Sequence, residues 1–464
     1  MDDTSRISDK EKSFQRYILF ITSFATFLTS FLGSASNIAL PAIGREFNAS
    51  AVQLGWVTTS FILTSSILML PFGRLADIIG RKKIYFTGLL LFTVSSCLII
   101  FSKNIRWLIL FRIFQGLSGA MVFSTSMAIV TAVFGPGERG KAIGINVTCT
   151  YLGLSAGPVL GGILTQYFGW RSIFLILVPF KIISLFLIKF KMKAGWADAA
   201  GEKYDWKGSI VYALALFGFM FGFSRLPALS GWIYLASGLI LAAVFVFMER
   251  RTVNPIIDFS LIITNRVFAF SSIAALINYA ATAAIGFFVS LYLQYLKGFD
   301  ARTAGLIMIS QPAAMALLSP AAGKLSDKIN PGIIASIGMG ITVIDLVLLC
   351  FINENTHVMS IAALLVIMGV GFGLFSTPNS NAIMSSVEKK QLGTASGVIG
   401  TMRSIGQMTS MSIAMMLLAI YTGTEQISPA TYGGLMKAIR TGFLTLAILS
   451  AFGIMASLAR NKRK

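Results

Sequence analysis

Residues 71–83 read PFGRLADIIGRKK, and a second version of this stretch, SPAAGKLSDKI, follows at residues 319–329. Three residues keep their register about 250 positions later, since Gly73, Leu75 and Asp77 return as Gly323, Leu325 and Asp327. The segment ERGKAIG at residues 138–144 returns in the same way as QLGTASG at residues 391–397. A repeat that holds its register through two motifs predicts a chain built of two related halves.

The composition indicates a membrane protein. Hydrophobic residues make up 55% of the chain and charged residues 12%, whereas a soluble domain has roughly 45–50% and 25%. The net charge of +20 would suggest nucleic acid as the partner of a soluble protein. Here the basic residues gather in loops assigned to one side of the membrane, which is the positive-inside bias. A basic surface for acidic partners is the alternative, and we expect no nucleic-acid partner.

The usage of cysteine and histidine narrows the possible chemistry. Cys97, Cys149 and Cys350 lie in apolar segments, where they behave as small hydrophobes, so we expect no disulfide framework. The single histidine, His357, speaks against a metal enzyme built on a histidine cluster. The sequence also has no phosphate-binding loop of the GxxxxGK[ST] kind. We therefore expect no enzyme, no cofactor and no metal.

Apolar runs bounded by charge, glycine or proline predict the organisation of the chain. Fourteen runs have the length of a bilayer-spanning helix, and an even number places both termini on one side. Basic residues at both ends make that side cytoplasmic. The predicted parts are a cytoplasmic segment at 1–16, a six-helix bundle at 17–190, linker loops with two extra helices at 191–265, a second six-helix bundle at 266–459 and a basic cytoplasmic tail at 460–464. The fold class is thus an all-α, multi-pass cell-membrane protein with fourteen transmembrane helices.

The first motif forms a short cytoplasmic loop between two predicted helices. Gly73 allows close approach of a neighbouring helix, and Gly80 allows a tight turn. Asp77 is placed to cap a helix end and to pair with Arg74 or Arg81. An ordinary basic hairpin is the alternative interpretation, but it does not explain why the spacing returns in the second half.

The fourth predicted helix carries RIFQGLSGA with an arginine inside the apolar run. A guanidinium within the bilayer is costly unless it faces water or a partner, so a functional role for Arg112 is the default expectation. Gln115 lies one turn further on the same face and is expected to share its polar network. The alternative is that Arg112 reaches out to the membrane surface.

The fifth predicted helix reads GLSAGPVLGG. Gly153, Gly157 and Gly161 follow one another at four-residue spacing, which makes a groove for a neighbouring helix. Pro158 removes a backbone donor and is expected to bend the helix. Packing alone is the alternative, although it leaves Pro158 and Gly162 unexplained.

Together these motifs resemble the major facilitator superfamily, and within it the fourteen-helix drug:proton antiporters. The loop at 71–83, RIFQGLSGA and GLSAGPVLGG are similar to three of its characteristic motifs. Further similar segments are NIALPAI at 37–43, GWRSIF at 169–174 and LYLQYLKGFDARTAG at 291–305. The resemblance covers nearly the whole chain.

The resemblance implies roles for several of these residues. Asp77 and Arg81 would belong to a charge relay that controls the inner gate, with Gly323 and Asp327 marking the second copy of the motif. Arg112 would lie near the proton pathway. Gly157 and Pro158 would form a hinge that favours exchange. Alternating access would follow from rocking one half against the other.

The sequence departs from the family pattern at two points. Relatives that export cations often have an acidic residue nine positions before the proline of the ALP segment, and counting back from Pro41 leads to Leu32. The asparagine that usually precedes the proline of the sixth helix is also absent, because Leu177 and Val178 precede Pro179. We therefore expect a neutral or anionic amphipathic cargo rather than a simple organic cation.

A few charged residues fall deep within predicted helices, where charges commonly mark ion or substrate paths. They are Arg112, Lys181, Asp345 and Arg403. Asp345 is the one acidic group, and burial favours the protonated form of a lone carboxylate, so it is the candidate for coupling. A structural ion pair and exposure to an outer vestibule are its alternatives. For Lys181 the alternatives are a reach to the surface or a pair with Asp345.

The twelfth predicted helix contains FSTPNSNAI. Pro378 is expected to bend it, while Asn379 and Asn381 add hydrogen-bonding groups near its inner half. A polar kink of this kind suits gating. Interhelical hydrogen bonding by the two amides is an equally good interpretation.

The function predicted from these features is secondary active transport. The leading hypothesis is a proton-coupled antiporter that exports small amphipathic compounds, as multidrug efflux proteins do, and works as a monomer in the lipid bilayer. One alternative is a uniporter or symporter for an anionic metabolite. A second is a membrane sensor or scaffold that does not transport, although such a protein would need neither gating loop.

Overall fold

The computed structural model describes residues 2–49, 51–135, 137–192, 195–225, 228–257, 263–299, 301–422 and 431–460. These residues form α-helices joined by short turns, and no strand occurs among them. The chain divides into two compact units. The first comprises Met1–Asp205 and Val387–Gly400, and the second Trp206–Ser386 and Thr401–Lys464.

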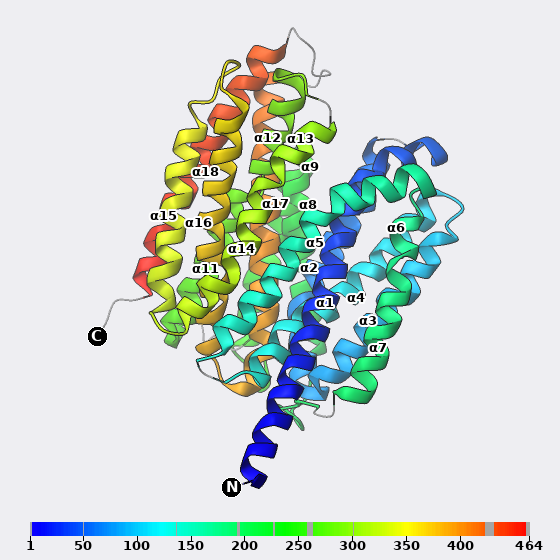
Figure 1. Cartoon of the computed structure of the whole chain (residues 1–464), viewed down its shortest axis with the longest axis vertical. Helices are drawn as coiled ribbons and strands as arrows, with labels where there is room; N and C mark the ends of the chain where they lie inside the picture. The colour runs from blue at the N-terminus through cyan, green and yellow to red at the C-terminus, as the bar shows by residue number, and fades with distance from the viewer. Residues whose placement is uncertain are drawn as a thin grey trace. The chain divides into compact units, whose positions relative to one another are not determined.

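The first unit contains the N-terminal helices, drawn from blue to green in Figure 1. They are α1 (Asp2–Phe47), α2 (Ala51–Ile79), α3 (Arg81–Ile100), α4 (Ile105–Val133), α5 (Arg139–Phe168), α6 (Ser172–Leu175) and α7 (Leu177–Lys191). Gly80 separates α2 from α3 with a φ of 109°, a conformation that suits glycine. Asn104 caps α4, because its side chain accepts a hydrogen bond from the Trp107 amide at 3.1 Å.

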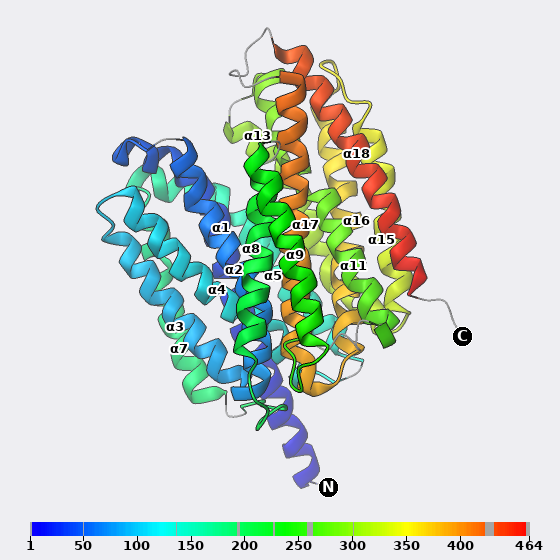
Figure 2. The same ribbon diagram turned by 180° about the vertical axis from the view of Figure 1, so that it is seen from behind.

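The second unit begins with the two helices that follow the linker, α8 (Trp206–Ser224) and α9 (Leu229–Glu249), which pack side by side (Figure 2). Its other α-helices are α11 (Arg266–Thr282), α12 (Ile285–Leu291), α13 (Ala301–Met308), α14 (Ser310–Ser326), α15 (Pro331–Leu349), α16 (Val358–Ser385) and α18 (Tyr432–Ala459). A π-helical turn, Tyr292–Leu296, follows α12, and a 3-10 turn, Lys389–Gln391, precedes α17. Helix α17 (Leu392–Thr422) starts in the first unit and continues in the second.

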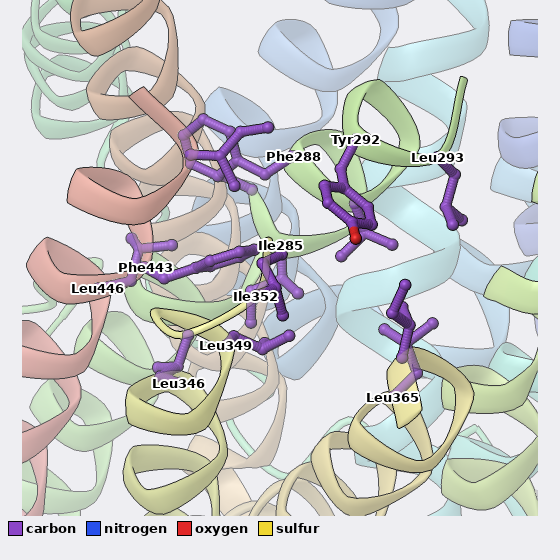
Figure 3. Close-up of a cluster of buried hydrophobic side chains, with 14 of the residues drawn as sticks. Ile285, Phe288, Tyr292, Leu293, Leu346, Leu349, Ile352, Leu365, Phe443 and Leu446 are labelled. Carbon is purple, nitrogen blue, oxygen red and sulfur yellow. The ribbon is translucent and has the colours of Figure 1, made fainter. Parts of the chain in front are cut away.

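An apolar core in the second unit is formed mainly by α12, α15, α16 and α18 (Figure 3). Phe288 of α12 meets Phe443 of α18 edge to face, with ring centroids 5.7 Å apart. Gly442 makes room for this contact, since a Cβ there would lie 2.5 Å from the Phe288 ring. The buried Tyr292 hydroxyl donates to the carbonyl of Asn353 at 2.6 Å. Its polar end is thus satisfied while its ring joins the core.

Among the described residues, eleven helical segments are long and apolar enough to cross a membrane. A twelfth, α5, passes the same test as a bent pair, with a bend of 41° between Gly157 and Val159. The apolar stretch Trp206–Gly222 in α8 is shorter. The prediction of an all-helical, multi-pass protein is confirmed, and the count of fourteen spans stays a prediction.

Candidate functional site

The loop motif forms a buried ionic contact in the first unit. Asp77 and Arg81 are both fully buried, and the Nε atom of Arg81 donates to Asp77 Oδ1 at 2.9 Å. Of the two partners expected for Asp77, Arg81 is therefore the one that it contacts. Asp77 also accepts hydrogen bonds from the amides of Gly393 at 2.8 Å and Thr394 at 3.0 Å. These amides belong to the first turn of α17, where helices leave their N–H groups unpaired.

Two glycines let the start of α17 approach α2 closely. A Cβ at Gly73 would lie 2.3 Å from the carbonyl oxygen of Gly393, and a Cβ at Gly393 would lie 2.2 Å from that of Gly73. Any side chain at either position would push the two backbones apart. The glycine predicted to allow close helix approach does so here, against the segment that Asp77 binds.

Arg81 has two further partners, which extend the site beyond the motif. Its Nη1 atom donates to Asp198 Oδ2 at 2.9 Å, and its Nη2 atom donates to the carbonyl of Lys389. Glu202 forms an ion pair with Arg74, which is 8% exposed. Asp198 and Glu202 were missed at the level of sequence, because they stand in an irregular loop without motif or periodicity.

The second copy of the motif has different surroundings in the second unit. Asp327 ends α14 there, and Gly323 is buried on the same helix. The Nδ2 atom of Asn381 donates to Ser326 Oγ at 2.9 Å and lies 3.5 Å from Asp327 Oδ1. Asn381 thus ties α16 to the end of α14.

Asn379 belongs to a neighbouring network that joins four helices, α11, α15, α16 and α18. It donates to the Ser271 carbonyl at 3.0 Å and accepts from Arg460 Nη1 at 2.7 Å. Arg460, at which the predicted basic tail begins, is 5% exposed and also donates to the Gly332 carbonyl at 2.8 Å. The rest of that tail lies outside the described residues. In this arrangement both asparagines act as interhelical hydrogen bonders, one of their two predicted roles.

Arg112 lies at the centre of a buried polar network in the first unit. It is 1% exposed, which rules out a reach to the membrane surface in this structure. Its Nε donates to the Val57 carbonyl at 2.9 Å, and its Nη1 donates to Gln115 Oε1 at 2.6 Å. Gln115 in turn donates to Ser96 Oγ at 3.0 Å. Arg112 and Gln115 therefore share one network, as their spacing predicts.

Lys181 is fully buried close to the same network. Its ammonium nitrogen lies 3.6 Å from the centroid of the Phe92 ring and 3.4 Å from Thr29 Oγ1. The Phe92 ring meets Phe61 edge to face at 6.4 Å, and Arg112 stacks over Phe61 at 4.6 Å. Two buried cations thus flank one pair of phenylalanines. Neither forms an ion pair with a carboxylate of the described residues.

Asp345 lies in the second unit and is fully buried on α15. Neither of its carboxylate oxygens has a hydrogen-bond partner among the described residues. It shares a helix face with Gly338, where a Cβ would lie 2.5 Å from the Gly371 carbonyl of α16. Asp345 therefore points into the seam between α15 and α16. Asp345 forms no ion pair with the described residues of its own unit, and its burial is at odds with exposure to an outer vestibule.

Arg403, the remaining deep charge, is partly buried on α17. Its role in a proton or substrate pathway stays a prediction.

The glycine stripe of α5 packs directly on α1, and Figure 1 shows the two helices side by side. A Cβ at Gly153 would lie 2.5 Å from the Phe27 carbonyl, and one at Gly157 would lie 2.4 Å from Ser34 Cβ. For Gly161 the nearest atom, Ala35 Cβ, would be 2.7 Å away.

Two other residues of the predicted hinge, Pro158 and Gly162, do not belong to this row of glycines. A Cβ at Gly162 would make only an ordinary contact, 3.9 Å from Ile38 Cγ2. The side chain of Pro158 lies outside the described side chains, and the helix bends at its position. The stripe provides a close helix contact, and the bend lies within it.

Comparison with known proteins places the chain in a family. The family model described as Major Facilitator Superfamily matches residues 22–411 and 271–463. The chain is 32% identical over 392 residues to the riboflavin transporter RibZ of Clostridioides difficile (strain 630), which covers 84% of this chain and 85% of RibZ. It is 29% identical over 415 residues to the multidrug resistance protein Stp of Mycobacterium tuberculosis (strain CDC 1551 / Oshkosh), which covers 88% of this chain and 76% of Stp.

A solved structure shares the fold. The crystal structure of the human organic anion transporter MFSD10 matches with a TM-score of 0.69 at 13% sequence identity, covering 96% of this chain and 99% of that one. The family match covers most of the sequence, and the loop motif, the buried arginine of α4 and the glycine stripe of α5 all lie within it. The chain therefore belongs to the Major Facilitator Superfamily.

Proposed function

We propose that this protein is a secondary active transporter that exports small amphipathic compounds in exchange for protons. It works by alternating access, in the manner of the fourteen-helix drug:proton antiporters. The observation that carries the proposal is the contact of Asp77 with the Gly393 and Thr394 amides. A buried carboxylate held by hydrogen bonds to another helix is a contact that can form and break as a unit, which a gate requires.

The names of the relatives support transport of small molecules. RibZ is called a riboflavin transporter and Stp a multidrug resistance protein. We infer that this chain also takes an amphipathic organic compound, and that its cargo is neutral or anionic.

Proton coupling is supported by buried groups that can change their charge. An isolated ionised carboxylate is expensive to bury, and binding a proton removes that expense. Asp345 has this environment on α15. The sequence lacks a nucleotide-binding loop, so an ion gradient is the energy source that we propose.

The proposed topology has fourteen spans, with both termini in the cytoplasm and a single chain as the working unit in the cell membrane. The eleven apolar segments become fourteen if α5, α8 and α17 also cross the bilayer. Labelling of single cysteines introduced at residues 12 and 464, each tested separately in intact cells, tests the sidedness. Modification of either by an impermeant reagent added outside would contradict it.

Transport by purified protein in liposomes tests the function. Riboflavin serves as a neutral probe, carboxyfluorescein as an anionic probe and tetraphenylphosphonium as a cationic probe, each measured with and without an imposed proton gradient. We expect gradient-driven transport of the neutral or the anionic probe. Preferential transport of the cation, retained after replacement of Arg112 and Lys181, would contradict the cargo that we propose. An absence of transport for every probe would favour the sensor or scaffold.

A second candidate is a uniporter or symporter for an anionic metabolite. It is favoured by the two fully buried cations, Arg112 and Lys181, which face the Phe61 and Phe92 rings and lack a carboxylate partner among the described residues. A carboxylate or phosphate group of the cargo would compensate this charge. Uptake of an anion that proceeds without a proton gradient, or that draws protons in the same direction, would select this function over antiport.

A further inference from the structure

The linker that follows α7 lies on the loop motif of the first unit. We refer to residues 195–205 as the strap. The Arg81 amide donates to the Trp196 carbonyl at 3.2 Å and the Lys82 amide to the Gly195 carbonyl at 3.4 Å, while the Ala199 amide donates to the Asp77 carbonyl at 3.0 Å. The strap therefore pairs with the backbone on both sides of the turn between α2 and α3.

The strap also supplies carboxylates to the two arginines of the motif. Asp198 accepts from Arg81 Nη1 at 2.9 Å, and Glu202 forms an ion pair with Arg74. Both carboxylate side chains are 33% exposed, whereas Arg81 is fully buried. The positive charge of a buried guanidinium must be compensated, because removing an isolated charge from water is expensive. The carboxylates of Asp77 and Asp198 both compensate the charge of Arg81.

The strap is held in place at its start. Trp196 has a φ of +44°, a left-handed conformation that is uncommon for a residue other than glycine. Its ring packs on Phe14 of α1, with centroids 6.4 Å apart. Backbone conformations of this kind persist where the surroundings enforce them. The Trp196 contact thus fixes the point from which Asp198 reaches Arg81.

Arg81 uses all three nitrogens of its planar guanidinium. Nε and Nη2 both contact Asp77 Oδ1, at 2.9 and 2.7 Å, and Nη1 donates to Asp198. Nη2 also donates to the carbonyl of Lys389, so two carboxylates orient the plane while one of its amino groups contacts the segment 387–400. The fork geometry of arginine makes this orientation specific.

We propose that the strap is a positioning element of the inner gate, in which Asp198 holds Arg81 ready to receive the segment 387–400. Loss of the Asp198 carboxylate leaves Asp77 as the one carboxylate that contacts the guanidinium among the described residues, and weakens the docking of that segment. The inference rests on the proposed function, because docking and release of the segment are steps of alternating access.

The strap leads directly into α8, the first of the two extra helices. Helix α8 begins at Trp206, directly after the strap, and the hydroxyl of its Tyr212 lies 3.2 Å from that of Thr401 on α17. Thr401 follows the docked segment in the chain. Helix α8 therefore touches the helix that carries the docking segment, while the strap that precedes it holds the arginine that receives this segment.

Cysteine labelling of the docked segment tests the proposal. Ser396 is 4% exposed, and its hydroxyl lies 3.4 Å from the Phe123 carbonyl, so a thiol there reacts only when the segment leaves. The reporter S396C is placed in a background with the three native cysteines replaced. A maleimide is applied to the cytoplasmic face in inside-out vesicles, and the labelling rate is compared between the background and D198N. A rate increase of about fivefold or more is expected for the loss of a partly buried charge pair.

Three further variants separate positioning from a general loss of structure. D198E keeps the charge and should restore most of the protection, while E202Q should raise the rate less than D198N because Glu202 touches Arg74 instead of Arg81. E46Q removes the ion pair of Glu46 with Arg171, whose side chains are 42% and 33% exposed, and should leave the rate unchanged. Equal rates in D198N and in the background would overturn the proposal. So would a rise in E46Q as large as that in D198N.

The labelling rate does not depend on any cargo. A protein that transports none of the probes can still show the effect of D198N, and the proposed function would then fail while the strap inference stands. A protein that transports normally but labels equally in both forms would contradict the strap alone.

Discussion

The carboxylate of Asp77 on α2 accepts a hydrogen bond of 2.8 Å from the backbone amide of Gly393, a residue 316 positions further along the chain. This contact joins two of the repeated motifs, since Asp77 belongs to the loop at 71–83 and Gly393 to the segment at 391–397. The amide lies in the first turn of α17, and a carboxylate at a helix N-terminus is favoured by the helix dipole. The contact is the structural basis for the gate that we propose.

Replacement of Gly73 by alanine is expected to weaken this docking. The added Cβ would lie 2.3 Å from the Gly393 carbonyl, and overpacking of this kind costs about 1–3 kcal/mol, or roughly 5- to 150-fold in the docking equilibrium. Transport in liposomes should fall, and labelling of S396C should rise. G33A is the matched control, because a Cβ at Gly33 meets nothing within 4 Å. Equal behaviour of the two variants would refute the role of the close contact.

Replacement of Arg112 by lysine is expected to abolish most transport although the charge remains. One ammonium group cannot reach both the Val57 carbonyl and Gln115 as the guanidinium does. We expect a loss of about tenfold or more, measured as initial rate in liposomes. R106K, on the exposed start of the same helix, should transport normally. Unchanged transport in R112K would show that the charge alone suffices.

Replacement of Lys181 by methionine is expected to leave the protein as stable as before, or more stable. The ammonium group is fully buried against Phe92 without a carboxylate partner among the described residues, and an apolar chain of similar length avoids the desolvation of the charge. Thermal unfolding in detergent measures this, with K189M on the exposed part of α7 as control. A strong loss of stability in K181M alone would mean that the cation is needed for folding.

Replacement of Asp345 by asparagine is expected to uncouple transport from the proton gradient while the fold is kept. Helix α15 packs mainly against α16, which carries no charged residue, and against α18. The charges of α18 are Lys437 and Arg440 near its start, and Arg440 is bound to the Ile352 carbonyl at 2.8 Å. Gradient dependence is measured in liposomes, with E354Q in an exposed loop as control. Full coupling in D345N would remove Asp345 from the mechanism.

The ion pair of Glu46 with Arg171 should give a pH-dependent part of the stability. Burial by itself raises the pKa of Glu46, but the hydrogen bonds from Arg171 and Trp170 outweigh it and hold the pKa below its ordinary value of 4.5. A lowered pKa stabilises the fold above the unfolded-state pKa, and this contribution disappears as pH falls through the folded-state pKa. The melting temperatures of wild type and E46Q should therefore differ at pH 7, and this difference should shrink as the pH falls below the ordinary Glu value of 4.5. A difference that stays constant or grows as the pH falls through this range would contradict this assignment.

Much of the fold could be predicted because membrane helices leave a strong signal. A composition with few charges and a sequence of apolar runs require helices whose backbone groups are satisfied internally. The repeated motif singled out Asp77 and Gly73, because a buried charge and a close glycine contact both constrain the residues around them. The spacing of Arg112 and Gln115, one turn apart on one helix, was enough to predict that they share a polar network.

The rest of the site comes from contacts that sequence spacing does not encode. Lys181, Phe92 and Thr29 lie on three different helices, and only their packing brings the ammonium group onto the ring. Asp198 stands in an irregular loop whose course depends on the Trp196 conformation. Lys181 lies in the first unit and Asp345 in the second, so their pairing, one of the alternatives considered, stays a prediction.

Exchange of an organic compound for protons is what we propose for this member of the Major Facilitator Superfamily. The most direct measurement uses liposomes that contain the purified protein and a trapped pH-sensitive dye, with riboflavin and carboxyfluorescein each added on one side in turn. We expect that addition of a transported compound moves protons in the opposite direction, that an imposed proton gradient drives the compound uphill, and that D345N abolishes both effects. Transport of the compound without any proton movement, at a rate indifferent to the gradient, would contradict this proposal.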